Sequence, residues 1–459
     1  MTVPSGKSDS IDLAAIEEKL RGAKGKQFWR GLDELAETPR YREFLHNEFG
    51  DPDIEKASVS RRDLLKLMAA SAAFAGLSGC TKLPTQKIVP YVKQPEEIVP
   101  GKPLFYATAM TMGGVARGLL VESHMGRPTK IEGNPDHPAS LGATTVFEQA
   151  ALLTLYDPDR AQAVTNEGRI ATWDLLLAAL RRARDNHRPG KGAGLHILTE
   201  TITSPTLGSQ IQSLLAEFPQ AKWHQYEPVN RDAAREGARM AFGEYVNTVY
   251  RFDRADVILS LDSDFLYNDP GSVRYAHQFA NGRDVEMTGG KMNRLYVVES
   301  TPSITGSKAD HHLPMRSADV EPFARAVAGK LGMTPVGSAQ TKVDDAWISA
   351  LARDLQKNRG RSIVIAGDQQ PPAVHALAHA MNSALGNIGQ TVILTDPIEV
   401  NPRNEMQSIG ALVADMAAGQ VQTLLIFGSN PVYTAPADLQ FVRNFLKVPL
   451  RIHLSLYDD

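Results

Sequence analysis

Cysteine is almost absent from this chain, which contains a single one, Cys80, among 459 residues. One cysteine cannot form an internal disulfide. Iron–sulfur clusters are normally held by four thiolates, so we expect no cluster on this chain. If the protein takes part in electron transfer, the iron–sulfur clusters that carry the electrons must therefore lie on partner proteins.

Three further absences narrow the classes of function. No run of lysine and arginine stands out in a chain of net charge −3, which argues against a nucleic-acid-binding protein. No apolar stretch after residue 80 is long enough to span a membrane. A Gly-x-Ser-x-Gly nucleophile motif is also missing, so a hydrolase of that type is not expected.

The single cysteine ends a segment with the features of a bacterial export signal. A twin-arginine (Tat) motif is formed by Ser60, Arg61, Arg62, Leu64, Leu65 and Lys66. The weakly apolar run from Leu67 to Leu77 is too short to span a bilayer and is interpreted as the apolar region of the signal. The run ends in Leu77-Ser78-Gly79-Cys80, which resembles a lipobox. We therefore predict that Cys80 is acylated and becomes the first residue of the mature chain.

This interpretation predicts an exported protein that is held by lipid on the periplasmic face of the cytoplasmic membrane. An acylated residue tethers a protein to the surface and places no protein mass inside the bilayer. The alternative is a helix of small residues with a buried thiol, since free cysteine is often buried. Tat export moves folded proteins, often after cofactor insertion, which favours a redox protein.

Composition predicts six segments along the chain. They are an extended presequence (1–59), the Tat signal with its lipobox (60–80), a proline-rich linker (81–104), a small β-rich segment (105–160), a first α/β domain (161–335) and a second α/β domain (336–459) that is expected to be incomplete. The presequence contains short amphipathic pieces, which suit either chaperone binding or a solvated leader.

The body of the chain alternates short apolar runs with helical segments. The runs are 195–199, 256–261, 295–298, 362–367, 391–395 and 423–428. Continuous Val, Ile and Leu is typical of buried parallel strands, and the helices between them indicate βαβ units. Before them, residues 119–123 and 127–134 predict a hairpin with Gly126 in its turn. The expected fold class is α/β, with two Rossmann-like parallel-sheet domains after a small β-rich segment.

Six motifs in a fixed order together resemble the molybdopterin oxidoreductase family. They are 126–138, 156–160, 255–264, 309–314, 385–389 and 428–431. That family holds a bis-pterin guanine dinucleotide between two α/β domains. The resemblance implies possible or vestigial cofactor-binding residues in two loops, at Asp262, Ser263 and Asp264 and at Gly428, Ser429, Asn430 and Pro431.

Each loop also has a plain structural interpretation. Gly428 and Ser429 suit a close approach of backbone to phosphate, but the loop is equally consistent with a strand-to-helix turn capped by Asn430. In a relative without cofactor, Asp262 to Asp264 would merely cap the following helix. The sequence leaves both possibilities open.

Two departures from the family argue against an active site. Its cluster-binding cysteines are replaced here by residues 108–117, which contain no cysteine. The metal ligand of the family precedes a Phe-Gly step, which resembles Phe242-Gly243 of this chain. Asp232 is the one candidate ligand before this step. It is better explained as a solvated acid at the start of a helix. We therefore predict no catalytic residue, no metal ligand and no cofactor on this chain, with molybdopterin guanine dinucleotide as the alternative.

Histidines outside these loops are interpreted as structural. His311 and His312 follow Asp310 on one short segment, where neighbouring side chains of a strand point to opposite faces and do not chelate one ion easily. His124 and His137 lie close to turns. Hydrogen bonding within the fold is the expected role of all four.

The order of presequence, Tat motif, lipobox and cysteine-free body resembles the N-terminal part of the large iron–sulfur subunit of alternative complex III. The resemblance implies a non-catalytic, lipid-anchored scaffold in a quinol:electron-acceptor oxidoreductase of respiratory or photosynthetic electron transfer. Iron–sulfur clusters and haem are then expected on partner chains or on a missing C-terminal domain. The implied partners are an iron–sulfur domain, a multihaem cytochrome and quinol-binding membrane subunits.

Two other functions remain as alternatives. One is an active molybdopterin-dependent oxidoreductase that works without a cluster. The other is a solute-binding lipoprotein, against which the two nucleotide-type loops argue.

Overall fold

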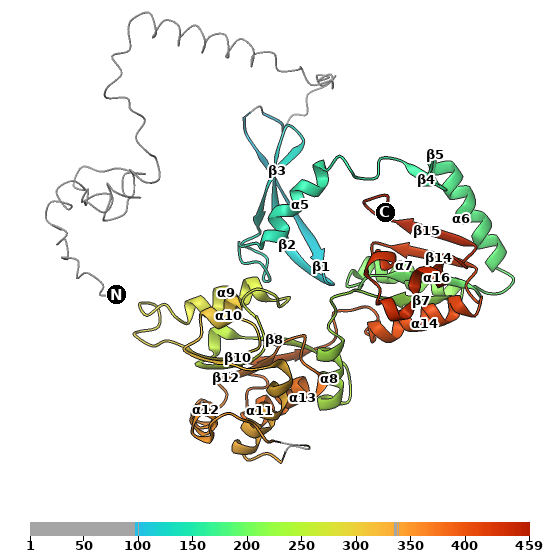
Figure 1. The fold of residues 1–459 in the computed structure, drawn as a ribbon. Helices are drawn as coiled ribbons and strands as arrows, with labels where there is room; N and C mark the ends of the chain where they lie inside the picture. Colours follow the sequence, from blue (N-terminus) through green and yellow to red (C-terminus); the bar gives the residue numbers. More distant parts are fainter. Residues whose placement is uncertain (1–96, 100, 335–336, 338) are drawn as a thin grey trace, which may run out of the picture. The chain divides into compact units, whose positions relative to one another are not determined.

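The computed structural model describes residues 97–99, 101–334, 337 and 339–459 (Figure 1). The Tat motif, Cys80, the whole presequence and most of the predicted linker lie outside these residues. Among the residues that are described, no helix is both long enough and apolar enough to cross a membrane.

The described chain begins with a small antiparallel sheet. Its strands are β1 (Leu104–Met112), β2 (Val115–His124) and β3 (Arg127–Gly133), in that spatial order. The turn between β2 and β3 places Met125 and Gly126 at φ of 52° and 78°. Two successive positive φ angles match a tight hairpin turn, so the predicted hairpin at Gly126 is confirmed. The elements that follow are α5 (Val146–Tyr156), β4 (Val164–Asn166) and β5 (Arg169–Ala171).

A buried ion pair fixes α5 against β2. Arg117 on β2 donates to Glu148 on α5 at 2.7 Å, and both side chains are almost fully buried. Thr145 and Glu148 also form a capping box at the start of α5.

The first parallel sheet has the order β7-β6-β14-β15. Its strands are β6 (Leu195–Thr199), β7 (Lys222–Gln225), β14 (Thr423–Phe427) and β15 (Leu450–Leu454). The accompanying helices are α6 (Trp173–His187), α7 (Pro205–Glu217), α14 (Glu405–Ala417), α15 (Pro431–Thr434), the 3-10 turn η3 (Ala437–Leu439) and α16 (Phe441–Phe445). Leu412 of α14 and Phe441 of α16 pack in one core cluster, and Ile211 of α7 packs with Trp223 in another.

The second parallel sheet has the order β12-β9-β10-β11. Its strands are β9 (Val257–Leu261), β10 (Arg294–Glu299), β11 (His311–Pro314) and β12 (Ser362–Ala366). The accompanying helices are α8 (Asp232–Phe242), the 3-10 turn η2 (Phe252–Arg254), α9 (Ser272–Asn281), α10 (Ile304–Ser307), α11 (Ser317–Lys330), α12 (Asp345–Lys357) and α13 (Pro372–Ala384).

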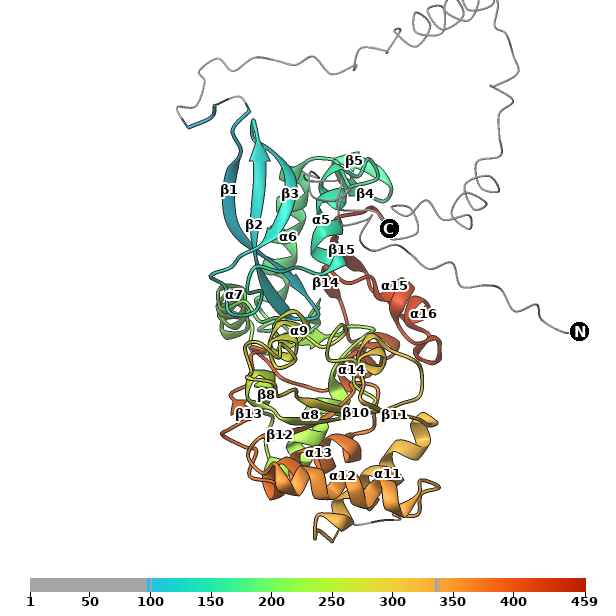
Figure 2. The same ribbon diagram turned by 90° about the vertical axis from the view of Figure 1, so that its left-hand side faces the viewer.

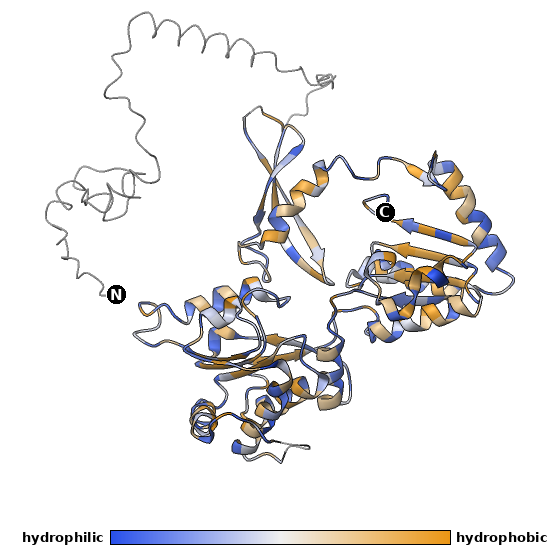
Figure 3. Ribbon diagram, viewed as in Figure 1, coloured by the Kyte–Doolittle hydropathy of each residue, from blue (hydrophilic) through white to orange (hydrophobic). Residues whose placement is uncertain are grey.

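Helices cover both faces of this second sheet. Phe323 of α11 and Leu351 of α12 share a core cluster with Leu259, whereas Phe279 of α9 packs in a separate cluster with Ile258. Figure 2 shows α11, α12 and α13 gathered on one side of the sheet. Every residue of β9 and β12 is buried, and Figure 3 shows the strands of this sheet mainly in the hydrophobic colours. Burial on both faces explains the continuous apolar runs in the sequence.

The strand pairing differs from the predicted division at residue 335. β12 follows that boundary but pairs with β9, while β14 pairs with β6, more than 200 residues earlier in the chain. The second sheet is therefore formed within the chain segment that separates β7 from β14. Apolar composition marks a strand as buried but does not say which other strand it pairs with, so the sequence alone did not show this insertion.

The prediction of a parallel strand at residues 391–395 is wrong. β13 (Val392–Thr395) runs antiparallel to β8 (Asn247–Tyr250) in a separate two-stranded ribbon. β13 is buried at its first residue and becomes more exposed along its length.

Candidate functional site

The first predicted loop leaves the carboxyl end of β9. Asp262 adopts a φ of 60° and is buried. Its Oδ1 accepts a hydrogen bond from the Ser300 backbone N–H at 2.9 Å, and its Oδ2 accepts one from Gln370 Nε2 at 2.7 Å. Ser300 follows β10 and Gln370 follows β12. The carboxylate therefore joins the ends of three neighbouring strands.

The other two residues of this loop also bond within the protein. Asp264 Oδ1 accepts from the Thr305 backbone N–H at 2.9 Å and from the Thr305 hydroxyl at 2.7 Å. Ser263 Oγ donates to Asp269 Oδ2 at 3.0 Å. A cap on the helix that follows, α9, is thus wrong for both side chains, because Asp262 bonds to the segments after β10 and β12 and Asp264 bonds to Thr305 in helix α10.

The second predicted loop leaves the carboxyl end of β14. Gly428 has a φ of 85°, which favours glycine. Asn430 Oδ1 accepts from the Tyr433 backbone N–H at 3.1 Å and caps the four-residue helix α15 at Pro431. The alternative of a capped strand-to-helix turn is confirmed for Asn430 and Pro431. Ser429 is buried and its hydroxyl has no partner within the described part of the chain.

Acidic side chains gather at the same edge of the first sheet. An ideal Cβ on Gly428 would lie 3.3 Å from a carboxylate oxygen of Glu200, which follows β6. Burial raises the pKa of Glu200. Burial, together with the carboxylates of Glu405 and Glu200, raises the pKa of Glu227 to about 7. The three acids come from the end of β6, the segment after β7 and the start of α14.

Arg235 holds part of this acidic cluster. Its Nη1 donates to Glu405 Oε1 at 3.0 Å and to Asp232 Oδ1 at 3.3 Å, and its Nη2 lies 3.2 Å from Glu399 Oε1. The four side chains are between 2% and 15% exposed. Glu405 also accepts from the Thr201 hydroxyl at 2.9 Å and the Glu227 backbone N–H at 2.7 Å. This network ties α8 to α14.

The expected solvated position of Asp232 is wrong. Asp232 is 8% exposed. Its carboxylate accepts from the backbone N–H groups of Glu405 at 2.9 Å and Met406 at 3.1 Å, at the start of α14. The positive end of a second helix packs against this acid, and the carboxylate stabilises that end.

A second polar cluster lies beside the first. Arg231 Nε donates to Asp368 Oδ1 at 3.2 Å. Burial and the charge of Asp368 raise the pKa of Asp269 well above its usual range. Arg231, Arg235, Asp269 and His375 line a cleft of only about 50 Å³.

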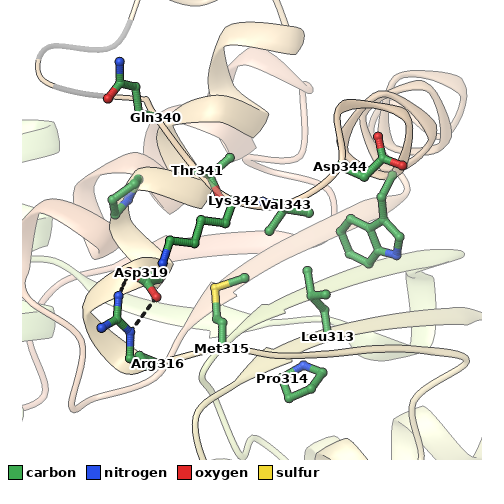
Figure 4. A pocket seen from close by; sticks show the side chains of 12 residues that line it. Leu313, Pro314, Met315, Arg316, Asp319, Gln340, Thr341, Lys342, Val343 and Asp344 are labelled. Carbon is green, nitrogen blue, oxygen red and sulfur yellow. Dashed lines mark hydrogen bonds and ion pairs between the residues drawn. The ribbon is translucent and has the colours of Figure 1, made fainter.

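A much larger cavity lies elsewhere, at the end of β11. It has a volume of about 560 Å³ and is lined by Leu313, Met315 and Trp347, with an ion pair between Arg316 and Asp319 (Figure 4). None of the residues predicted from the two loops lines this cavity.

The four histidines predicted to be structural contact other residues of the described fold. His312 Nε2 lies 2.8 Å from Glu299 Oε1, and the ring of His311 stacks on Tyr296 at 4.4 Å between centroids. His124 Nε2 lies 2.7 Å from Glu122 Oε1. The His137 ring occupies the space beside Gly118 where a Cβ would lie.

The raised pKa of Glu227 predicts a pH-dependent effect of Glu227→Gln. A carboxyl whose folded pKa exceeds its unfolded value costs stability as pH rises through that range. We expect the Glu227→Gln variant and its parent to be about equally stable near pH 5. At pH 8 the free energy of unfolding of the variant should exceed that of the parent by about 1–2 kcal/mol. Urea denaturation at both pH values measures the difference.

Glu217→Gln is the matched control, because the Glu217 side chain is 52% exposed. The same change there should leave the pH dependence of stability unaltered. A constant difference between the Glu227→Gln variant and its parent at both pH values would contradict the burial of the Glu227 charge.

Comparisons with known proteins add a sequence relative and a structural one. No protein-family model matches the chain. It is 22% identical over 385 residues to the "Menaquinone reductase, molybdopterin-binding-like subunit" of Nitratidesulfovibrio vulgaris (strain Hildenborough), covering 74% of this chain and 54% of that protein. The chain thus spans about half the length of this curated relative. The structure of acetylene hydratase from Pelobacter acetylenicus aligns with a TM-score of 0.54 at 12% identity, covering 76% of this chain and 60% of that one.

The structural match bears on the fold and the sequence match on the family. The predicted α/β fold with Rossmann-like parallel sheets is confirmed by the strand order and by the likeness to acetylene hydratase. The name of the sequence relative agrees with the family that the six motifs resemble. The likeness to acetylene hydratase concerns the fold alone.

Proposed function

We propose that this chain is a non-catalytic scaffold subunit of a membrane quinol:electron-acceptor oxidoreductase of the alternative complex III type. The relative from Nitratidesulfovibrio vulgaris is named as a molybdopterin-binding-like subunit of a menaquinone reductase, which supports a place in a quinone-linked complex. The single cysteine supports a role without an iron–sulfur cluster on this chain.

The observation that carries the non-catalytic role is the state of the two strand-end loops. Asp262 and Asp264 already accept hydrogen bonds from Ser300, Gln370 and Thr305. In the other loop the carboxylate of Glu200 stands next to Gly428, where the backbone would have to approach a phosphate. A carboxylate in that place repels a pyrophosphate rather than binding it.

These residues therefore do not fit a pterin guanine dinucleotide. We propose that this chain has retained the fold of the molybdopterin oxidoreductases, and that its own side chains occupy the place where that family holds its cofactor. Electrons then pass through iron–sulfur clusters and haem of partner chains or of a further domain.

The proposed partners are an iron–sulfur domain, a multihaem cytochrome and quinol-binding membrane subunits. Purification of the native complex through a tag on this chain tests the assignment. We expect haem and iron–sulfur absorption and quinol oxidation to co-purify with the tag, while the chain purified alone oxidises no quinol. Recovery of the chain without redox partners from detergent-solubilised membranes would contradict the proposal.

We further propose Tat export and a lipid anchor on Cys80. Substitution Cys80→Ser should move the protein from the membrane fraction to the periplasmic fraction when it is expressed without its partners, because the acyl tether is lost. Replacement of both Arg61 and Arg62 by lysine should instead retain the precursor in the cytoplasm. Mass spectrometry of the mature N-terminus checks the acylation, and an unmodified, uncleaved peptide would contradict it.

A further inference from the structure

We propose that His196, His224 and Asp415 form a binding site for a divalent transition-metal ion of the zinc class. The three residues come from β6, β7 and α14, so such an ion would join a helix to two strands of the first sheet. This site lies apart from the strand-end loops, and the inference does not depend on the proposed function.

The strand register brings the two histidines to one face of the sheet. His196 pairs with Lys222, and Leu198 pairs with His224. His196 and Leu198 share a face, as do Lys222 and His224, so the two histidines are diagonal neighbours. His196 Nδ1 lies 3.1 Å from His224 Nε2, and both residues are at most 5% exposed.

Asp415 completes the group of ligand atoms. Its Oδ2 lies 4.0 Å from His196 Nδ1, and one atom from each of the three residues falls within 4.8 Å of the others. Two imidazole nitrogens bound tetrahedrally at roughly 2.0–2.1 Å from zinc are about 3.3 Å apart. The observed nitrogen separation is close to that value, so a small rearrangement would admit the ion.

The hydrogen bonds around His224 fix its tautomer in a form that can bind metal. His224 Nδ1 lies 3.0 Å from the Ser408 backbone oxygen, which accepts only from an N–H. Nε2 is then left with its lone pair, directed at His196. In metal-binding histidines, the ring nitrogen that does not bind the metal usually donates to a backbone carbonyl or a carboxylate, which orients the ring.

Charge and access also suit a cation. In the metal-free protein His224 Nε2 accepts from His196 Nδ1–H, so metal binding requires this proton to move to His196 Nε2, which gives both ligand nitrogens a lone pair. Lys222 Nζ donates to Asp415 Oδ2 at 2.7 Å, and its side chain is 52% exposed. The lysine competes with a metal for this oxygen but is free to swing into solvent, which opens the fourth position to water.

Zinc binding to the full chain tests the site. The Cys80→Ser protein should be used throughout, because a free thiolate binds zinc by itself. We expect one zinc per chain by calorimetry and metal analysis at pH 7.5, and tetrahedral visible bands with Co²⁺. His224→Gln and Asp415→Asn should each weaken zinc binding by about tenfold or more, and Lys222→Met should strengthen it.

His453→Gln is the matched control, since His453 Nδ1 lies 3.7 Å from Asp459 Oδ1 without a second histidine. That change should leave zinc affinity unaltered. Circular dichroism checks that each variant is folded, and a rise in the melting midpoint with zinc should occur in the parent and be lost in His224→Gln. Absence of stoichiometric zinc, or equal affinity in parent and ligand variants, would overturn the site in favour of a simple hydrogen-bonded histidine pair.

Discussion

Replacing Arg235 with methionine should lower the free energy of unfolding by about 3–5 kcal/mol. Arg235 is the cation that faces the buried carboxylates of Glu405, Asp232 and Glu399. Methionine fills similar space but leaves these charges uncompensated, and removal of one partner from a buried ion pair is strongly destabilising. Chemical denaturation of the two proteins at pH 7 measures the loss.

Arg239→Met provides the control on the same helix. Arg239 pairs with Glu236 at 2.5 Å, but its side chain is 53% exposed. An exposed pair of this kind contributes little to stability, so we expect only a small loss. Equal losses in Arg235→Met and Arg239→Met would show that the acidic cluster around Arg235 is solvated, which would contradict its burial in this structure.

Gly367→Ala should cost about 3 kcal/mol, the upper end of what overpacking usually causes. A Cβ on Gly367 would lie 1.9 Å from the backbone oxygen of Asp262, and Gly367 N–H donates to Leu261 O at 3.0 Å. Neither backbone segment can give way without breaking the contacts of Asp262. Thermal and urea denaturation should both show the loss.

Gly410→Ala is the matched control within helix α14. An added Cβ there meets no atom within 4 Å. Because glycine in a helix interior is less favourable than alanine by about 0.5–1 kcal/mol, this change should stabilise the protein. Equal changes in stability in Gly367→Ala and Gly410→Ala would mean that the backbone of Asp262 does not pack closely against Gly367.

The sequence was most informative where burial is complete. β9 and β12 are buried at every residue, and their unbroken apolar runs predicted them as parallel strands. The hairpin at Gly126 was equally clear because few residues tolerate its turn. The pairing of β14 with β6 could not be predicted, since strands distant in sequence share the same composition as strands that follow one another.

The candidate site was only partly predictable for a related reason. Motifs marked the loops at Asp262 and Gly428, which do follow β9 and β14. Glu200 and Glu227 were missed, although an acid just after a buried strand is a signal that could have found them. Asp232 was misplaced because its burial depends on α14, which lies some 170 residues further along the chain.

The most direct test of a non-catalytic scaffold is the molybdenum, tungsten and pterin content of the native complex. The complex should be purified from its own membranes and analysed by metal mass spectrometry and by fluorescence of oxidised pterin. We expect neither metal and no pterin in stoichiometric amount with this chain, because Asp262 and Asp264 are hydrogen-bonded within the protein and Glu200 stands beside Gly428. One molybdenum or tungsten per chain, with pterin in proportion, would contradict the account and establish an active cofactor site.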